Sequence, residues 1–262
     1  MTPVKFMSLR SGWPYDRQKG KGTRRLSRLA TNIGWQLAPR YMIGTAYPKA
    51  DPALEDVYLG RGLILIHIPK NAGTSVEDAI YNYRVRHRTW RDIRDSCPRA
   101  WASLPKIAIL RDPVDRFLSA FDYLKSGGRN EADRRFAARV IAQRSIEEFV
   151  DRFASRAGFR HTAMRYFHFR PQSDFICDAE QVMVEHMIPF PKMADGLVKF
   201  AGVAPGALAH ANRTTGHRTR KSDLSPDTLD VMTRFYAQDA ALFAQACQDW
   251  EATEAVEARS ET

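Results

Sequence analysis

Cysteine is scarce in this 262-residue chain, and long apolar runs are missing. Cys97, Cys177 and Cys247 lie far apart and are odd in number, so they match neither a zinc-ligand pattern nor a disulfide framework, and they indicate a reducing compartment. No segment has the apolar length of a transmembrane helix, and the N-terminus lacks the apolar core of a signal peptide. We therefore expect a cytoplasmic protein.

Acidic residues are outnumbered, since 40 lysines and arginines face 30 aspartates and glutamates and give a formal net charge of +10. Such a balance suits a polyanionic ligand, an acidic saccharide, nucleic acid or an anionic membrane surface. No zinc finger or aromatic RNA-binding signature is present, so nucleic acid is not the expected partner. A basic segment near the N-terminus precedes Leu26, Leu29, Ile33 and Leu37, whose helical spacing predicts a helix that docks on the core or makes peripheral membrane contact.

The nucleotide-binding pattern Gly-x-x-x-x-Gly-Lys-Ser/Thr is also absent, but a related arrangement occupies residues 63–80, LILIHIPKNAGTSVEDAI. The apolar start predicts a buried parallel strand, and the polar continuation predicts a loop that opens a helix. A cation, a glycine, two hydroxyls and free helix-start amides then suit a phosphate or phosphosulfate. The candidate ligands are Lys70, Asn71, Ala72, Gly73, Thr74 and Ser75. Alternatively, Thr74 and Glu77 have the spacing of a capping box.

A second strand-to-helix turn is predicted at residues 107–121, IAILRDPVDRFLSAF. Asp112 suits the N-cap and Pro113 the first helical position. Arg111 at the strand end can bind a second phosphate through its guanidinium, and the Ser119 hydroxyl, two turns into the helix, adds a donor.

These two motifs together resemble the carbohydrate-type sulfotransferases, which take sulfate from 3′-phosphoadenosine 5′-phosphosulfate (PAPS) and release 3′-phosphoadenosine 5′-phosphate (PAP). HIPKNAGTS at residues 67–75 resembles the family's 5′-phosphosulfate loop, and LRDPVDRFLSAF at residues 110–121 resembles its 3′-phosphate element. The resemblance is firm over residues 63–125 and implies that Lys70 and its neighbours bind the phosphosulfate. It further implies that Arg111 and Ser119 bind the 3′-phosphate, and that the chain is a soluble bacterial member.

A base must accept the proton of the acceptor hydroxyl, and histidine suits this near neutral pH. His87 is the best candidate because it lies between the two motifs, where many family members resemble it. Its three flanking arginines should lower its pKa by repulsion between like charges, or they could bind an anionic acceptor. Glu77 is an alternative base; His168 could face the acceptor cleft, and His67 is expected in the core or in the cleft wall. Lys70 is expected to act in catalysis as well, by stabilising charge on the bridging oxygen.

Other segments give weaker expectations. Residues 129–155 have a helical pattern with a capping box at Ser145 and Glu148, and residues 181–188 suggest a late strand. The basic segment 210–224 is expected to be a mobile loop that could close over the nucleotide, with Arg213 and Lys221 as candidate contacts. The alternative for each of these residues is a place in a solvated run of charges. A final helix is expected to start at Ser225-Pro226. We divide the chain into a basic extension packing on the core (1–60), a sulfotransferase domain (61–250) and a flexible tail (251–262).

The sequence as a whole predicts an α/β, P-loop-like three-layer fold with a mostly parallel sheet flanked by helices. The expected reaction is transfer of a sulfuryl group from PAPS, without a metal, to a hydroxyl of a carbohydrate or glycolipid. Two alternatives are a P-loop-type kinase that uses ATP and a non-enzymatic polyanion-binding protein. The sequence gives no expectation for the oligomeric state.

Overall fold

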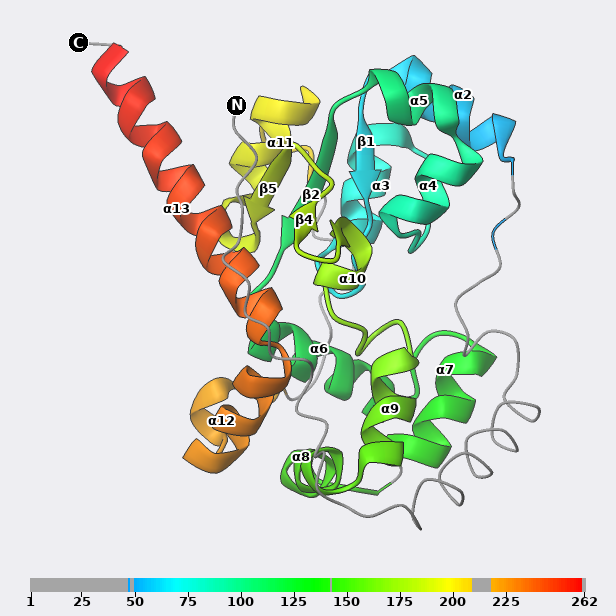
Figure 1. Cartoon of the computed structure of the whole chain (residues 1–262), viewed down its shortest axis with the longest axis vertical. Helices are drawn as coiled ribbons and strands as arrows, with labels where there is room; N and C mark the ends of the chain where they lie inside the picture. Colours follow the sequence, from blue (N-terminus) through cyan, green and yellow to red (C-terminus); the bar gives the residue numbers. More distant parts are fainter. Residues whose placement is uncertain (1–46, 48–49, 142, 209–217, 261–262) are drawn as a thin grey trace.

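The computed structural model describes residues 47, 50–141, 143–208 and 218–260, and within them helices dominate (Figure 1). The basic helix expected around Leu26 to Leu37 lies outside the described residues. The α-helices are Pro52–Arg61 (α2), Gly73–Tyr81 (α3), Trp90–Ser96 (α4), Pro98–Ser103 (α5), Pro113–Lys125 (α6), Glu131–Phe136 (α7), Ile146–Ser155 (α8), Ala157–Arg165 (α9), Ser173–Ile176 (α10), Met193–Ala201 (α11), Pro226–Phe235 (α12) and Ala237–Ser260 (α13). Shorter turns are the π-helix Ala137–Ile141 (η2) and the 3₁₀ helices Phe190–Lys192 (η3) and Lys221–Asp223 (η4).

The central sheet has three parallel strands, β1 (Ile64–Ile66), β2 (Lys106–Leu110) and β5 (His186–Pro189), in the order β1-β2-β5. Ile64 lies opposite Lys106, and Ile107 lies opposite His186. Because the strands are parallel, β1 and β2 both end at the same edge of the sheet. The mixed α/β fold around a parallel sheet is therefore confirmed, and both predicted strand-to-helix turns start at one edge of the sheet.

Both faces of this sheet are buried, which explains why its strands are apolar without alternation. Ile64, Ile66 and Ala108 pack on one face with buried side chains of α2, α4, α10 and α13. Leu65 and Ile107 pack on the opposite face with side chains of α3 and α11. The sheet is thus the middle of three layers.

A second, helical half of the molecule contains a separate aromatic core. It is built by α6, η2, α8, α9 and α12, and α13 runs alongside both halves (Figure 1). Phe117 of α6 lies at the centre, with ring centroids 4.9 Å from Phe169 and 5.7 Å from Phe149. Because α6 belongs to the second strand-to-helix turn, this packing holds that turn in place.

Several local expectations are confirmed, and others need correction. Asp112 caps α6 and Ser145 with Glu148 forms the capping box of α8. The late strand is in fact two short strands, β4 (Gln181–Val182), paired antiparallel with β3 (Cys177–Asp178), and β5. The final helix is interrupted at Tyr236 into α12 and α13, and α13 extends to Ser260.

Candidate active site

The loop after β1 bends sharply, because Lys70 and Ala72 adopt left-handed backbone conformations with φ of 71° and 58°. Left-handed residues in a short loop curl the backbone and turn its amides inward, a geometry that binds anions. Ala72 is the N-cap of α3 and makes no side-chain capping bond, so the N-cap side chain does not occupy the backbone amides at this helix start. The capping box suggested by Thr74 and Glu77 is wrong.

Glu77 has a different role, since its buried carboxylate binds His67. His67 Nδ1 lies 2.7 Å from Glu77 Oε1, which also accepts the backbone N–H of Arg86 at 2.8 Å. The imidazole of His67 packs directly on Gly73, where an added Cβ would lie 1.8 Å from the ring. Only glycine therefore allows the loop and His67 to occupy their positions together.

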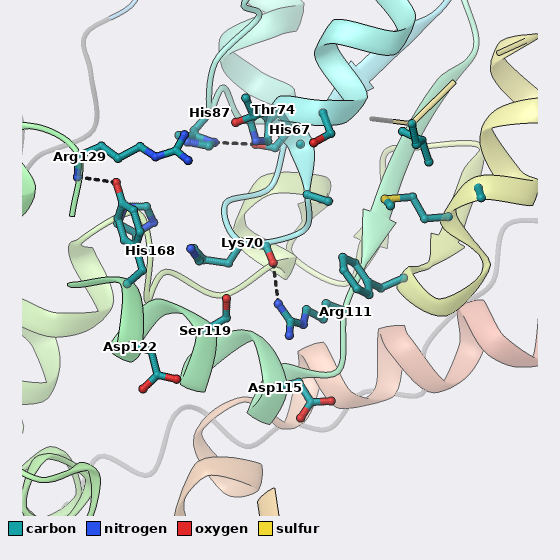
Figure 2. A pocket seen from close by; sticks show the side chains of 18 of the residues that line it. His67, Lys70, Thr74, His87, Arg111, Asp115, Ser119, Asp122, Arg129 and His168 are labelled. Carbon is teal, nitrogen blue, oxygen red and sulfur yellow. Dashed lines mark hydrogen bonds between the residues drawn. The ribbon is translucent and has the colours of Figure 1, made fainter. Parts of the chain in front are cut away.

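The second motif approaches the first through Arg111. Pro113 is the first residue of α6, and Arg111 stands between the end of β2 and this helix. The Arg111 guanidinium donates from Nη1 to the carbonyl of Lys70 at 3.1 Å and lies 4.9 Å from the ring of Phe190. Figure 2 shows Arg111, Ser119 and Lys70 around the same space. The two turns thus face each other.

A buried amide fixes the distance between the turns. Gln172 Oε1 accepts from Asn71 Nδ2 at 2.7 Å and from the backbone N–H of Arg111 at 3.1 Å, while Gln172 Nε2 donates to the Arg111 carbonyl at 2.8 Å. Asp239 of α13 accepts the backbone N–H groups of Gln172 at 2.7 Å and Ser173 at 2.9 Å. We call Asn71, Arg111 and Gln172 the amide clamp. Sequence analysis missed Gln172, because nothing local indicates that its amide faces both motifs.

A cavity of about 970 Å³ lies between the two turns. Eight of the predicted site residues line it, namely Lys70, Ala72, Gly73, Thr74, Ser75, His87, Arg111 and Ser119. One end is apolar and is lined by Phe190, Met193, Val198, Val203 and Leu208. The opposite end is polar and aromatic and is lined by His87, Tyr123, Arg129, Phe167 and His168.

Two predicted contacts, Asn71 and Lys221, are not among the described residues that line this cavity. The side chain of Asn71 is buried, and its amide donates to the Ile109 carbonyl at 2.7 Å and to Gln172, so it holds the loop against β2. Lys221 pairs with Asp112 at 2.6 Å. Arg213 lies outside the described residues.

The ammonium group of Lys70 lies in the cavity, where burial and neighbouring cations destabilise its charged form. Its Nζ is 4.1 Å from the centroid of the Tyr123 ring. Burial, followed by the nearby charges of Arg111 and Arg129, lowers the pKa of Lys70 to about 8. A cation destabilised in this way gains most when an anion enters.

His87 lies at the polar end, half-buried, with Nδ1 3.3 Å from the His67 carbonyl. A carbonyl only accepts, so Nδ1 carries the proton and Nε2 keeps a lone pair. The pKa of His87 is lowered as predicted, but the cause differs. Burial is the main reason, followed by His67 and His168, whereas the flanking Arg84 pairs with Asp78.

Sequence analysis also missed several residues that line the cavity. Asp115, Asp122 and Tyr123 lie three to four residues from Ser119 along α6, so helical periodicity alone would have placed them on the same face. Asp122 accepts the Thr219 N–H at 2.9 Å and the Thr219 hydroxyl at 2.8 Å, which holds that segment beside the cavity.

The described residues contain neither a candidate membrane span nor a candidate metal cluster. None of the helices in those ranges is both long and apolar enough to cross a membrane. No group of three or more His, Cys, Asp or Glu side chains within the described part of the chain could hold a metal ion.

No curated protein and no solved structure matches the chain significantly. A family model described as "Sulfotransferase family" matches residues 60–244, which is more than half of the chain and includes both turns and the residues between them. The chain therefore belongs to the sulfotransferase family, specifically sulfotransferase family 2.

Proposed function

We propose that this sulfotransferase uses PAPS as its donor and sulfates a hydroxyl group of a carbohydrate or glycolipid. The main support is that the loop at Lys70 and the strand end at Arg111 meet at one cavity, joined by the 3.1 Å contact between them. PAPS carries a 5′-phosphosulfate and a 3′-phosphate, so its binding needs two anion-binding sites at a fixed separation. The amide clamp supplies that separation.

The residues present fit this donor. The curled loop has no Cβ at Gly73, so backbone amides can approach a phosphosulfate closely, and Lys70 supplies a cation. Arg111 and Ser119 would hold the 3′-phosphate, and Arg111 can do so through two parallel hydrogen bonds. The apolar end of the cavity, between Phe190 and Leu208, suits a purine base.

When bound, PAPS supplies a sulfuryl group on a phosphate leaving group. Transfer forms a bond between the acceptor oxygen and sulfur, breaks the bond between sulfur and the bridging oxygen, and releases one proton. We assign that proton to His87 Nε2, which is unprotonated because Nδ1–H donates to the His67 carbonyl. Lys70 would stabilise the charge that develops on the bridging oxygen. Negative charge at the donor site also raises the pKa of His87, which strengthens it as a base.

Single substitutions separate binding from turnover. Lys70→Ala and Arg111→Ala should each weaken PAP binding in calorimetry by about 30-fold or more, since each removes charge-assisted hydrogen bonds worth about 2 kcal/mol or more. His87→Ala should leave PAP affinity unchanged but should abolish sulfation of a panel of cell-envelope glycans. Sulfation is measured by mass spectrometry after incubation with labelled PAPS. His161→Ala, on the exposed face of α9, is the matched control.

Competing functions give opposite results in the same assays. A preference for Mg-ATP over PAP in thermal-shift measurements would indicate a kinase. Affinity for polyanions without PAP binding would indicate a binding protein. Full turnover by His87→Ala would remove His87 as the base.

A further inference from the structure

His168 is a buried histidine at the polar end of the cavity that the proposed reaction does not yet use. It lies in the turn after α9, is only 5% exposed, and lines the cavity. Its ring centroid is 4.8 Å from that of Tyr123 and 6.4 Å from that of His87. Figure 2 shows His168 and His87 at the same end of the site as Arg129.

A buried carboxylate lies behind this ring. Asp133 is fully buried and accepts the Tyr123 hydroxyl at 2.6 Å, the Tyr166 hydroxyl at 2.5 Å and the Arg129 backbone N–H at 3.1 Å. Burial alone would raise the pKa of Asp133, but His168 and the two tyrosines hold it far below its usual range. Asp133 is therefore ionised, and it presents negative charge to His168.

The two ring nitrogens of His168 have different surroundings. Nε2 lies 3.4 Å from Asp133 Oδ1, close enough to favour the proton on that nitrogen, although this is an electrostatic contact and not a full hydrogen bond. Nδ1 is buried and has no hydrogen-bond partner among the described residues. Burial lowers the pKa of His168 to about 4, so the ring is neutral near pH 7. Nδ1 therefore carries a lone pair without a donor, which is costly in a buried position.

We propose that His168 Nδ1 accepts a hydrogen bond from an acceptor hydroxyl that neighbours the one sulfated, so that the site recognises a diol. The inference rests on the proposed function and adds a second imidazole to the acceptor end. The ring centroids of His87 and His168 are 6.4 Å apart, a separation that two neighbouring hydroxyls of one molecule can span. Phe167, with ring centroids 4.0 Å from His168 and 5.1 Å from His87, adds an apolar surface against which the C–H face of a sugar ring can pack.

The test compares His168→Ala with His168→Asn in the full-length chain. Asparagine places its side-chain oxygen near the position of Nδ1, so it keeps the acceptor that alanine removes. For a glycan that the wild type sulfates, His168→Ala should raise the KM for the glycan about five- to tenfold, the value of one neutral hydrogen bond, with PAP affinity unchanged. His168→Asn should recover most of this loss.

A deoxy analogue makes the test specific to the second hydroxyl. The analogue lacks the hydroxyl next to the sulfated one, and the wild type should use it with the same five- to tenfold higher KM. His168→Ala should not distinguish the two glycans. If His168→Ala still distinguishes them, or loses PAP affinity in parallel, the inference is overturned.

An independent readout does not need turnover. Imidazole ¹⁵N spectra of the PAP-bound wild type at pH 7 should show His168 neutral, with Nε2 protonated and Nδ1 bare. A protonated Nδ1 overturns the inference whatever the kinetics. If PAP binds but no glycan is sulfated, the proposed acceptor class fails, and the spectrum still decides the state of His168.

Discussion

The depressed pKa of Lys70 makes donor binding depend on pH in a direction that can be worked out. In the free protein this pKa is lowered from 10.5 to about 8, first by burial and then by Arg111 and Arg129. An anionic ligand binds the cationic form. Affinity should therefore be full below pH 8 and should fall as the pH rises through it.

The size of the effect follows from the fraction of Lys70 that is charged. With a pKa of about 8, about nine-tenths of Lys70 is cationic at about pH 7 and about one-tenth at about pH 9. PAP affinity should thus fall about tenfold over this range, or about 1.4 kcal/mol. A solvated lysine, with its pKa near 10.4, would give almost no change.

Isothermal calorimetry with PAP at intervals between about pH 7 and pH 9 measures this directly. A phosphate monoester has its second pKa near 6, so the charge of the ligand is nearly constant in this range. Lys70→Met should bind PAP weakly and without the pH dependence. Arg111→Met should shift the fall to higher pH, because one cause of the low Lys70 pKa is removed. Equal affinity at both ends of the range, or the same slope in Lys70→Met, would refute the assignment.

Two further substitutions test how the site is held. Gly73→Ala should displace His67, because the new Cβ would lie 1.8 Å from the imidazole ring, and should therefore lower both the melting temperature and the PAP affinity. The control is Gly60→Ala, where an added Cβ has nothing within 4 Å; this change should be neutral or should stabilise the protein by up to about 1 kcal/mol. Gln172→Ala leaves the buried groups of the amide clamp unpaired, so it should lower the free energy of unfolding, measured by chemical denaturation, by about 2–4 kcal/mol and should weaken PAP binding. The control Gln238→Ala changes an exposed side chain and should change the free energy of unfolding by less than about 0.5 kcal/mol. If Gln172→Ala loses stability but keeps full PAP affinity, the clamp supports the fold without setting the distance between the turns.

Local sequence was sufficient where neighbouring residues decide the structure. Asp112 followed by Pro113 starts α6 because a capping carboxylate and a fixed φ act within one turn of the chain. The same holds for the capping box of Ser145 and Glu148. Local sequence gave a wrong prediction at Thr74. The spacing of Thr74 and Glu77 matches a capping box, but the carboxylate of Glu77 is bound by His67, ten residues earlier.

The cause of the pKa shift of His87 could not be predicted from its neighbours in the sequence. Three arginines beside His87 in the sequence suggested repulsion between charges, yet burial dominates, and Arg88 turns away to pair with Asp51. Similarly, the sequence indicates the charge of Lys221 but not that the fold places Asp112 2.6 Å from its ammonium group. A side chain's charge can be read from sequence, whereas its partner depends on the fold.

The sequence by itself determined the two strand-to-helix turns, the residue types at each turn and membership of the sulfotransferase family, because these depend on short-range order along the chain. Only the tertiary structure decided that both turns open onto one cavity, that Gln172 sets their separation, and that His168 meets Asp133 beside His87. Gln172 lies 61 residues from Arg111 and 101 from Asn71. Contacts at such distances along the chain are fixed by the packing of whole helices and strands, which no local pattern encodes.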